Sequence, residues 1–349
     1  MKSSYKKEDV CLLLKDITGL VRPQPAIERE RLIQSGKHYC EMLPVEYVPT
    51  QAYMDAYQSA LAQFAGPTAL AAGRLSDKIM HRKGAGTVLV SLARAGIPAG
   101  ILLKRYIRQK YRVELPHYAV SIIRGRGIDR NAMRYLLERY APNRLLFVDG
   151  WIGKGAILKE LQKETAAFYG VSSDIAVLAD PANVTSLCGT HEDILIPSSC
   201  LNCTVSGLIS RTFLRDDIIG KDDFHGAVYY GELADRDLSY EFIHAIESEF
   251  KMDVLAEDNA IEGSGMEEAG QIARRFEVDD INLIKPGIGE TTRVLLRRVP
   301  WKILIGEGGR QDMALAHILR LAQEKNIPVE TYPLRHYRAC GIIKKLADT

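Results

Sequence analysis

The chain has 349 residues, of which 46% are apolar, and it carries a formal net charge of +2. This length and apolar content allow two hydrophobic cores, while the lack of a basic-then-apolar leader or of an apolar run near the roughly 18 residues of a membrane span favours a soluble, cytoplasmic protein without membrane partners. The six cysteines have no even spacing, which predicts reduced thiols and excludes a disulfide framework.

The composition along the chain predicts two folded units. Residues 1–30 are interpreted as a helical N-terminal extension, and residues 31–252 as an α/β unit with a parallel sheet. Polar residues and glycine displace the apolar pattern over 253–265, which is interpreted as a linker. Residues 266–349 are expected to form a second, smaller unit with an α/β/α pattern.

The first motif follows a short apolar strand predicted at residues 87–90. Small residues and a single arginine occupy the loop expected at 91–100. Arg94 supplies a guanidinium group with parallel donors and Gly96 permits close backbone approach, so together with Ser91 they suit an anionic group.

A second loop, rich in arginine, follows the strand predicted at 118–123. It contains Arg124, Arg126 and Asp129 among glycine residues. Such a loop is either a mobile cationic cover for an anionic ligand or an ordinary solvated surface.

The most informative motif lies at residues 145–158. An apolar run predicts a buried strand ending at Asp149, and glycines then precede a helix predicted from Ala156. The backbone N–H groups of such a loop and the N-terminus of the helix favour a phosphate monoester. The residues assigned to this phosphate loop are Gly150, Trp151, Ile152, Gly153, Lys154, Gly155 and Ala156.

Two other nucleotide-binding motifs fit this stretch less well. A Walker loop requires serine or threonine after its lysine, but Gly155 follows Lys154. The glycine order of dinucleotide-binding loops is reversed here. An ordinary strand–turn–helix joint is the remaining alternative.

The three motifs together resemble the type I phosphoribosyltransferases, which hold phosphoribosyl pyrophosphate between a loop for the 5′-phosphate and a loop for pyrophosphate. The resemblance implies that Asp149 binds ribose hydroxyls, that Arg94 and Gly96 bind pyrophosphate, and that Arg124 or Arg126 closes over the site. It also implies a magnesium ion that neutralises the departing pyrophosphate. The chain has Gly150 where that family usually has a second acidic residue, which leaves one ribose hydroxyl contact unassigned.

The middle of the chain holds four residues with the paired spacing of metal ligands, namely Cys188, His191, Cys200 and Cys203. They predict a zinc site, a reactive cysteine with His191 or His225 as its base, or structural thiols. A strand is expected at 194–197 and a helix at 204–214. In a peptidase, Cys200 or Cys203 at the start of that helix would be the nucleophile, because the helix dipole lowers a thiol pKa.

Short motifs spread over most of the chain resemble one bacterial family. They lie at 91–96, 121–129, 147–151, 204–208 and 223–226. The family is found with tellurite-resistance and stress-response genes, and its members are described both as predicted phosphoribosyltransferases and, under the label StiP, as cysteine proteases. The two descriptions imply different chemistry.

The C-terminal part is basic. Residues 281–349 carry twelve Lys or Arg against six Asp or Glu, a local net charge of +6. The apolar pattern predicts helices at 290–298 and 313–325, strands at 301–305 and 329–333, and a last helix at 339–345.

Motifs in this part resemble the Pelota and kink-turn-binding ribosomal protein family in order and spacing. The resemblance implies that Glu290, Arg293 and Lys285 contact RNA. Gly289 stands where that family has asparagine, so binding of structured RNA is expected without kink-turn specificity.

The combined prediction is a phosphoribosyltransferase that uses phosphoribosyl pyrophosphate and an unidentified acceptor, joined to an RNA-binding unit. Asp129 and His225 complete the predicted catalytic residues, and His225 is expected to orient the acceptor together with Asp223. The alternatives are a cysteine peptidase and a non-catalytic nucleotide sensor. A homodimer is compatible with the sequence.

Overall fold

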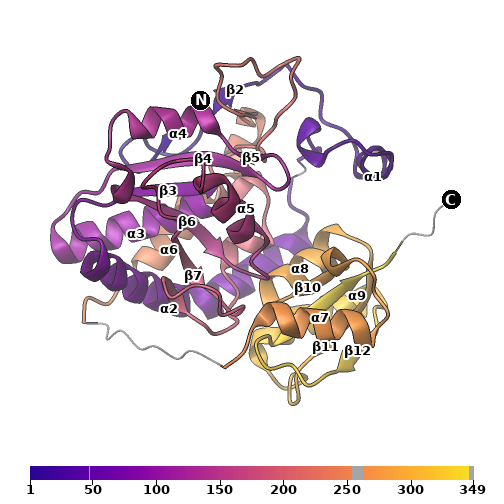
Figure 1. Cartoon of the computed structure of the whole chain (residues 1–349). Helices are drawn as coiled ribbons and strands as arrows, with labels where there is room; N and C mark the ends of the chain where they lie inside the picture. Colours follow the sequence, from indigo (N-terminus) through magenta and orange to yellow (C-terminus); the bar gives the residue numbers. More distant parts are fainter. Residues whose placement is uncertain (47, 254–261, 346–349) are drawn as a thin grey trace.

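The computed structural model describes residues 1–46, 48–253 and 262–345, and divides them into a larger and a smaller α/β unit (Figure 1). The smaller unit, drawn in orange and yellow, lies against one end of the larger one. None of the described helices combines the length and the apolar character that crossing a bilayer requires. The predicted α/β class, with a parallel main sheet and a second α/β unit, is confirmed.

The main sheet has the strand order β1-β4-β3-β6-β7-β8, and every pair in this order is parallel. The strands are β1 (Cys11–Leu12), β3 (Val88–Ala93), β4 (His117–Ile123), β6 (Leu145–Trp151), β7 (Ile175–Ala179) and β8 (Cys188–Thr190). A short antiparallel strand, β5 (Gly127–Ile128), pairs with β4. Because the central strands are buried along nearly their whole length, helices must cover both faces.

Alternating residues of the central strands face two different apolar clusters. Leu89 and Leu146 belong to the cluster with α2 (Gln51–Arg82), α3 (Gly96–Tyr111) and α6 (Ser239–Glu247). Val90 and Phe147 belong to the cluster with α4 (Arg130–Leu137) and α5 (Ala156–Thr165). This alternation follows from the two-residue period of a strand.

The prediction of a helical extension over residues 1–30 is wrong. This segment contributes β1 to the main sheet and β2 (Lys15–Asp16), which pairs with β9 (Gly226–Ala227), and only its end enters a helix, α1 (Ala26–Gln34). Short strands here depend on partners distant in sequence, which a local pattern does not reveal.

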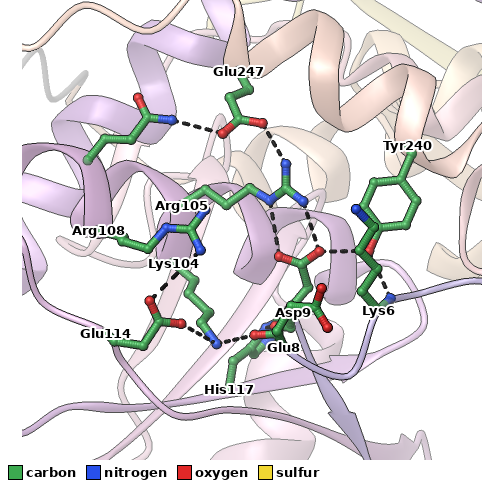
Figure 2. A network of polar contacts seen from close by, with 11 residues as sticks. Lys6, Glu8, Asp9, Lys104, Arg105, Arg108, Glu114, His117, Tyr240 and Glu247 are labelled. Carbon is green, nitrogen blue, oxygen red and sulfur yellow. Dashed lines mark hydrogen bonds and ion pairs between the residues drawn. The ribbon is translucent and has the colours of Figure 1, made fainter.

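A polar network fastens the first residues to the main unit (Figure 2). Arg105 of α3 donates to both carboxylate oxygens of Asp9, at 3.1 and 2.8 Å, and pairs with Glu247 of α6 at 2.5 Å. His117 Nδ1 lies 2.7 Å from the carbonyl oxygen of Asp9, and burial lowers the pKa of His117 to about 4. A neutral His117 can therefore donate to that carbonyl.

Three further local predictions in the main unit are wrong. Helix α3 begins at Gly96, so the loop expected at 91–100 is mostly the end of β3 and the first helical turn. The helix expected at 204–214 is reduced to the 3-10 turn Cys203–Val205, because Gly207 and Leu208 adopt positive φ angles of 75° and 54°. The strand expected at 194–197 does not form.

The smaller unit contains a sheet with the order β10-β13-β11-β12. Its elements are α7 (Gly265–Arg275), β10 (Ile284–Pro286), α8 (Ile288–Arg297), β11 (Pro300–Ile305), α9 (Ala316–Glu324), β12 (Val329–Thr331) and β13 (Ala339–Ile343). The remaining 3-10 turns of the chain are Tyr39–Glu41, Pro142–Arg144, Pro197–Cys200, Gly231–Arg236, Ile281–Leu283 and Met313–Leu315.

The last helix predicted for this unit is wrong, because residues 339–343 form the buried strand β13 between β10 and β11. A short apolar run fits a helix and a strand equally well, and sheet pairing decides between them. Most of the predicted linker, at 254–261, lies outside the described residues.

Candidate functional site

The predicted phosphate loop forms, but the smaller unit covers it. Strand β6 ends at Trp151, and α5 begins at Ala156 after Gly155, whose φ of 82° places it in the left-handed region. The ammonium group of Lys154 donates to the carbonyls of Ile281 and Ile284 at 2.5 and 2.8 Å. The loop therefore serves as a docking surface for the smaller unit.

Further contacts support this docking. The hydroxyl of Tyr337 donates to the carbonyl of Gly153 at 2.7 Å. A methyl group on Gly153 would lie 3.6 Å from Glu290. Ile152 is buried among the apolar residues of the main unit, so its side chain does not face a ligand.

Asp149 lies at the carboxyl end of β6, and its Oδ1 accepts the N–H of Gly150 at 2.8 Å. The pKa of Asp149 is raised to about 7, mainly by burial and to a smaller extent by the nearby Glu290, whereas the Gly150 N–H and Arg293 oppose the shift. Burial likewise lowers the pKa of Lys154 to about 8. Near neutral pH, both side chains are therefore present partly in their neutral and partly in their charged forms.

The residues predicted to hold pyrophosphate make internal contacts. Ser91 lies within β3, where its hydroxyl bonds to the carbonyl of Gly96 at 2.9 Å and to His117 at 2.7 Å. Arg94 pairs with Glu46 at 2.9 Å and donates to the carbonyl of Ile209 at 2.7 Å. Gly96 packs so closely on the β6 backbone that a side chain there would collide with Val148.

The arginine-rich loop is exposed at its tip. The side chain of Arg126 pairs with Glu41 at 2.8 Å. The backbone N–H of Arg124 donates to the Tyr39 hydroxyl at 3.0 Å, and the backbone carbonyl of Arg124 lies 3.1 Å from His38 Nε2. Residues 38–41 thus lie beside this loop.

Asp129 and His225 are buried and hold main-unit elements together. Asp129 caps α4 through two N–H groups at 3.0 Å and accepts the backbone N–H of His225 at 2.6 Å. His225 Nδ1 lies 2.8 Å from the hydroxyl of Ser121, and burial lowers the pKa of His225. Asp223 pairs instead with Lys15 at 2.6 Å.

The four candidate zinc ligands do not converge. Among the described residues, no group of three or more His, Cys, Asp or Glu side chains is arranged to hold a metal ion. Cys200 and Cys203 are both fully buried, and burial raises the pKa of Cys203 to about 12. The helix dipole that would have lowered a thiol pKa is missing, because only a three-residue turn begins at Cys203.

The other half of that motif forms a cysteine–histidine contact. Cys188 Sγ lies 3.3 Å from Nε2 of His191, and Nδ1 of His191 lies 3.0 Å from the carbonyl oxygen and 3.8 Å from Oδ2 of Asp180. A proton on Nδ1 then donates to Asp180 and leaves Nε2 free to accept the thiol proton. Cysteine, histidine and the backbone carbonyl beside the ring thus lie in the order that nucleophilic catalysis uses, with the Asp180 carboxylate close to the same ring nitrogen.

Local structure explains this arrangement. Asp180 follows the last residue of β7, Cys188 opens the neighbouring parallel strand β8, and His191 directly follows β8. Oδ2 of Asp180 also accepts the N–H groups of Val184 and Thr185 at 2.7 and 2.8 Å, which fixes the connecting loop. The Cys-x-x-His spacing was visible in the sequence, where it left open a zinc site, a reactive cysteine or structural thiols, and only the sheet brings in Asp180.

A second cysteine–histidine contact is less well equipped. Cys40 Sγ lies 2.9 Å from His38 Nδ1, but the other ring nitrogen faces the carbonyl of Arg124 and no carboxylate. Burial raises the pKa of Cys40 to about 11, which disfavours the thiolate.

The Cys188 pair is enclosed. Cys188 is fully buried and His191 is 6% exposed. Cys188 shares its apolar cluster with Ala182 of the β7–β8 loop. A small hollow between the two units is lined by Ala179, Pro181 and Glu290 among others, but the described lining does not include Cys188 or His191.

Comparisons with known proteins cover nearly the whole chain. The family model described as "Tellurite-like stress resistance cysteine protease StiP" matches residues 3–247, and the "PELOTA RNA binding domain" matches residues 263–345. The relative named "Cysteine protease StiP" from Acinetobacter baylyi is 34% identical over 98% of this chain and 94% of its own length.

One solved structure, the HGPRT-ase of Leishmania tarentolae in complex with GMP, covers 36% of this chain and 71% of its own. Its identity is 16% and its TM-score 0.26, values too low to support an argument about fold or function. The predicted phosphoribosyltransferase activity is wrong, because the family and the relative are both described as cysteine proteases. The magnesium ion was expected only together with phosphoribosyl pyrophosphate.

Proposed function

The chain belongs to the StiP family, and from this premise we propose that it is a cysteine peptidase in which Cys188 is the nucleophile and His191 the general base. The observation that carries the proposal is the 3.3 Å contact between Cys188 Sγ and His191 Nε2, with Asp180 on the opposite side of the ring. Cys200 and Cys203, expected as nucleophiles from the sequence, are replaced by Cys188 in this role.

The proposed reaction follows from the order of Cys188, His191 and Asp180. Nε2 of His191 takes the thiol proton of Cys188, and the thiolate attacks the carbonyl carbon of the peptide bond. The carbon–nitrogen bond breaks as the imidazolium gives its proton to the departing amine, leaving a thioester. Water, deprotonated by His191, then hydrolyses the thioester, releasing the acid and restoring the thiol.

Asp180 would orient His191 and stabilise its charged form. The Asp180 carbonyl fixes the Nδ1 proton, and the carboxylate oxygen at 3.8 Å faces the same nitrogen. The other carboxylate oxygen, Oδ1, is buried without a hydrogen-bond partner in the described part of the chain. Burial also raises the pKa of Asp180. Formation of an imidazolium next to this carboxyl group would favour its ionised form.

We further propose that the smaller unit binds RNA, because residues 263–345 match an RNA-binding domain and residues 281–349 carry a basic excess. Glu290, Arg293 and Lys285, the residues expected to contact RNA, lie toward the main unit, where Arg293 stacks over Trp151 at 5.6 Å. RNA contacting these residues would therefore lie along the junction of the two units.

Peptidase activity is tested with the full-length protein and a library of peptides, with cleavage followed by mass spectrometry. Cys188→Ala and His191→Ala should each abolish cleavage, because they remove the nucleophile and the base. Cys203→Ala is the matched control, since Cys203 is equally buried but has no histidine within hydrogen-bond distance in the described chain. Cleavage that survives Cys188→Ala would exclude this assignment.

RNA binding is tested by titrating the same protein with a structured RNA at increasing salt. Affinity should fall steeply with salt, because each neutralised phosphate releases counterions. Arg293→Ala should weaken binding. Arg320→Ala should have little effect, because Arg320 is an exposed residue of α9 and is paired with Glu324 at 3.8 Å. Retention of no RNA at low salt would remove this function.

A further inference from the structure

Arg211 occupies an unusual position for a cationic side chain. It lies in the segment between β8 and β9, and its guanidinium carbon is 4.9 Å from the centre of the Tyr39 ring. Within the described residues, no carboxylate lies within ion-pair distance of Arg211. Its side chain is partly exposed, so a small ligand can reach it.

The charged side chains that act on Arg211 are mainly other arginines. Arg94 donates to the carbonyl of Ile209, two residues before Arg211. The pKa of Arg211 is lowered to about 10, mainly by burial and in addition by the neighbouring Arg29, Arg94 and Arg293. Like charges collected in this way favour a bound anion.

The local charge balance is positive. Arg94 is paired with Glu46, and Arg293 with Glu290, so each of these arginines has one carboxylate and Arg211 has none in the described chain. The paired side chains keep some exposure, 18% for Arg94 and 38% for Arg293, so both can also turn donors toward a ligand.

We propose that Arg211, with Arg94 and Arg293, forms a binding site for a phosphate group at the junction of the two units. Arginine suits this ligand, because its guanidinium fork donates two parallel hydrogen bonds to phosphate oxygens. The three terminal oxygens of a phosphate monoester also offer more acceptor sites than the two oxygens of a carboxylate, which suits a cluster of arginines. The phosphate belongs to an RNA end or to a free mononucleotide. Binding of an RNA end rests on the proposed RNA-binding function, whereas binding of a mononucleotide is independent of it.

The first experiment compares thermal unfolding of the full-length protein in phosphate and in chloride at equal pH and ionic strength. Phosphate should raise the midpoint of the wild type, because a ligand that binds only the folded state stabilises it. Arg211→Gln should remove this response while leaving the midpoint in chloride unchanged or higher, because it relieves the repulsion among the arginines.

The matched control is Arg215→Gln. Arg215 lies four residues further along the same segment and also contacts an aromatic ring, that of Phe213, but it is paired with Asp217 at 2.5 Å. This variant should keep the full phosphate response. If Arg211→Gln fails to fold, Arg211→Lys, which keeps the charge but loses the fork, should show a reduced response.

The second experiment separates the two sources by titrating AMP and a short RNA with either a 5′-phosphate or a 5′-hydroxyl. Arg211→Gln should weaken whichever phosphorylated ligand binds by about tenfold or more. Binding of AMP or of 5′-phosphorylated RNA that depends on Arg211 supports the site, with or without binding of other RNA. No phosphate response in the wild type, or undiminished binding by Arg211→Gln, overturns it, even if RNA binding elsewhere on the smaller unit persists.

Discussion

Asp149 shows at the scale of one residue how burial couples a carboxylate to pH. Its pKa of about 7 in the folded protein lies above the ordinary 3.8, so between these values the folded chain holds a proton that the unfolded chain has lost. Stability should therefore fall as pH rises from about 4 to about 7. Asp149→Asn should stabilise the protein at pH 8 by roughly 1–4 kcal/mol, at about 1.4 kcal/mol per pKa unit.

This pH dependence is measured by urea unfolding at pH 5 and pH 8. The gain from Asp149→Asn should be large at pH 8 and small at pH 5, where the aspartate is already protonated. Asp174→Asn is the control, since the Asp174 carboxylate is 54% exposed and should show no such difference. An equal effect of Asp149→Asn at both pH values would contradict the buried, protonated carboxyl group.

At the scale of one element, helix α8 is capped from the other unit. Its N-cap residue, Gly287, offers no side chain, and the carboxylate of Asp193 accepts the N–H of Ile288 at 3.0 Å and that of Arg338 at 2.8 Å. Asp193→Ala should cost about 2–4 kcal/mol, because it leaves buried N–H groups unpaired as well as a helix uncapped.

The loss is read from the urea midpoint and from proteolysis between the two units, which should become faster. Asp193→Asn keeps an acceptor oxygen and should lose less. Asp280→Ala is the matched control: Asp280 caps a turn inside the smaller unit, accepting the N–H of Asn282 at 2.8 Å, and its loss should cost about 1 kcal/mol or less without faster cleavage. If both alanine variants behaved alike, Asp193 would not fasten the units.

The strand–turn–helix of β6 and α5 was predictable, because an apolar run and three glycines specify it locally. The contact of this loop with the smaller unit was not predictable, because Lys154 binds carbonyls more than 120 residues further along the chain. Cys188 and His191 were identified as a motif, but their meeting with Asp180 depends on the pairing of β7 with β8. The resemblances to the StiP and Pelota families were confirmed, whereas the choice of phosphoribosyltransferase over cysteine protease was wrong.

At the scale of the whole molecule, the smaller unit contacts the β7–β8 loop, which packs in the same apolar cluster as Cys188. Gly265, which begins α7, donates its N–H to the carbonyl of Ala182 at 3.0 Å. A side chain at Gly265 would collide with Tyr337 and lie 2.7 Å from the Ala182 backbone. Gly265→Val should push the β7–β8 loop away from α7 and speed alkylation of Cys188 by iodoacetamide severalfold.

Alkylation at each cysteine is followed by mass spectrometry on the folded protein. Gly270→Val is the matched control, because Gly270 lies on the same helix but a side chain there would meet only the flexible end of Arg274, at 3.7 Å. This variant should leave the labelling rate unchanged. A folded Gly265→Val protein that protects Cys188 as well as the wild type does would show that the contact does not control access.

The contacts between the smaller unit and the main unit also predict which positions change together among the sequences of this family. Lys154 binds backbone carbonyls, which every residue type offers, so the side chains of Ile281 and Ile284 can change without disturbing that contact. Gly265 is different, because the room it leaves is filled by Tyr337. Among homologous sequences, positions 265 and 337 should therefore change together, whereas position 154 should change independently of 281 and 284.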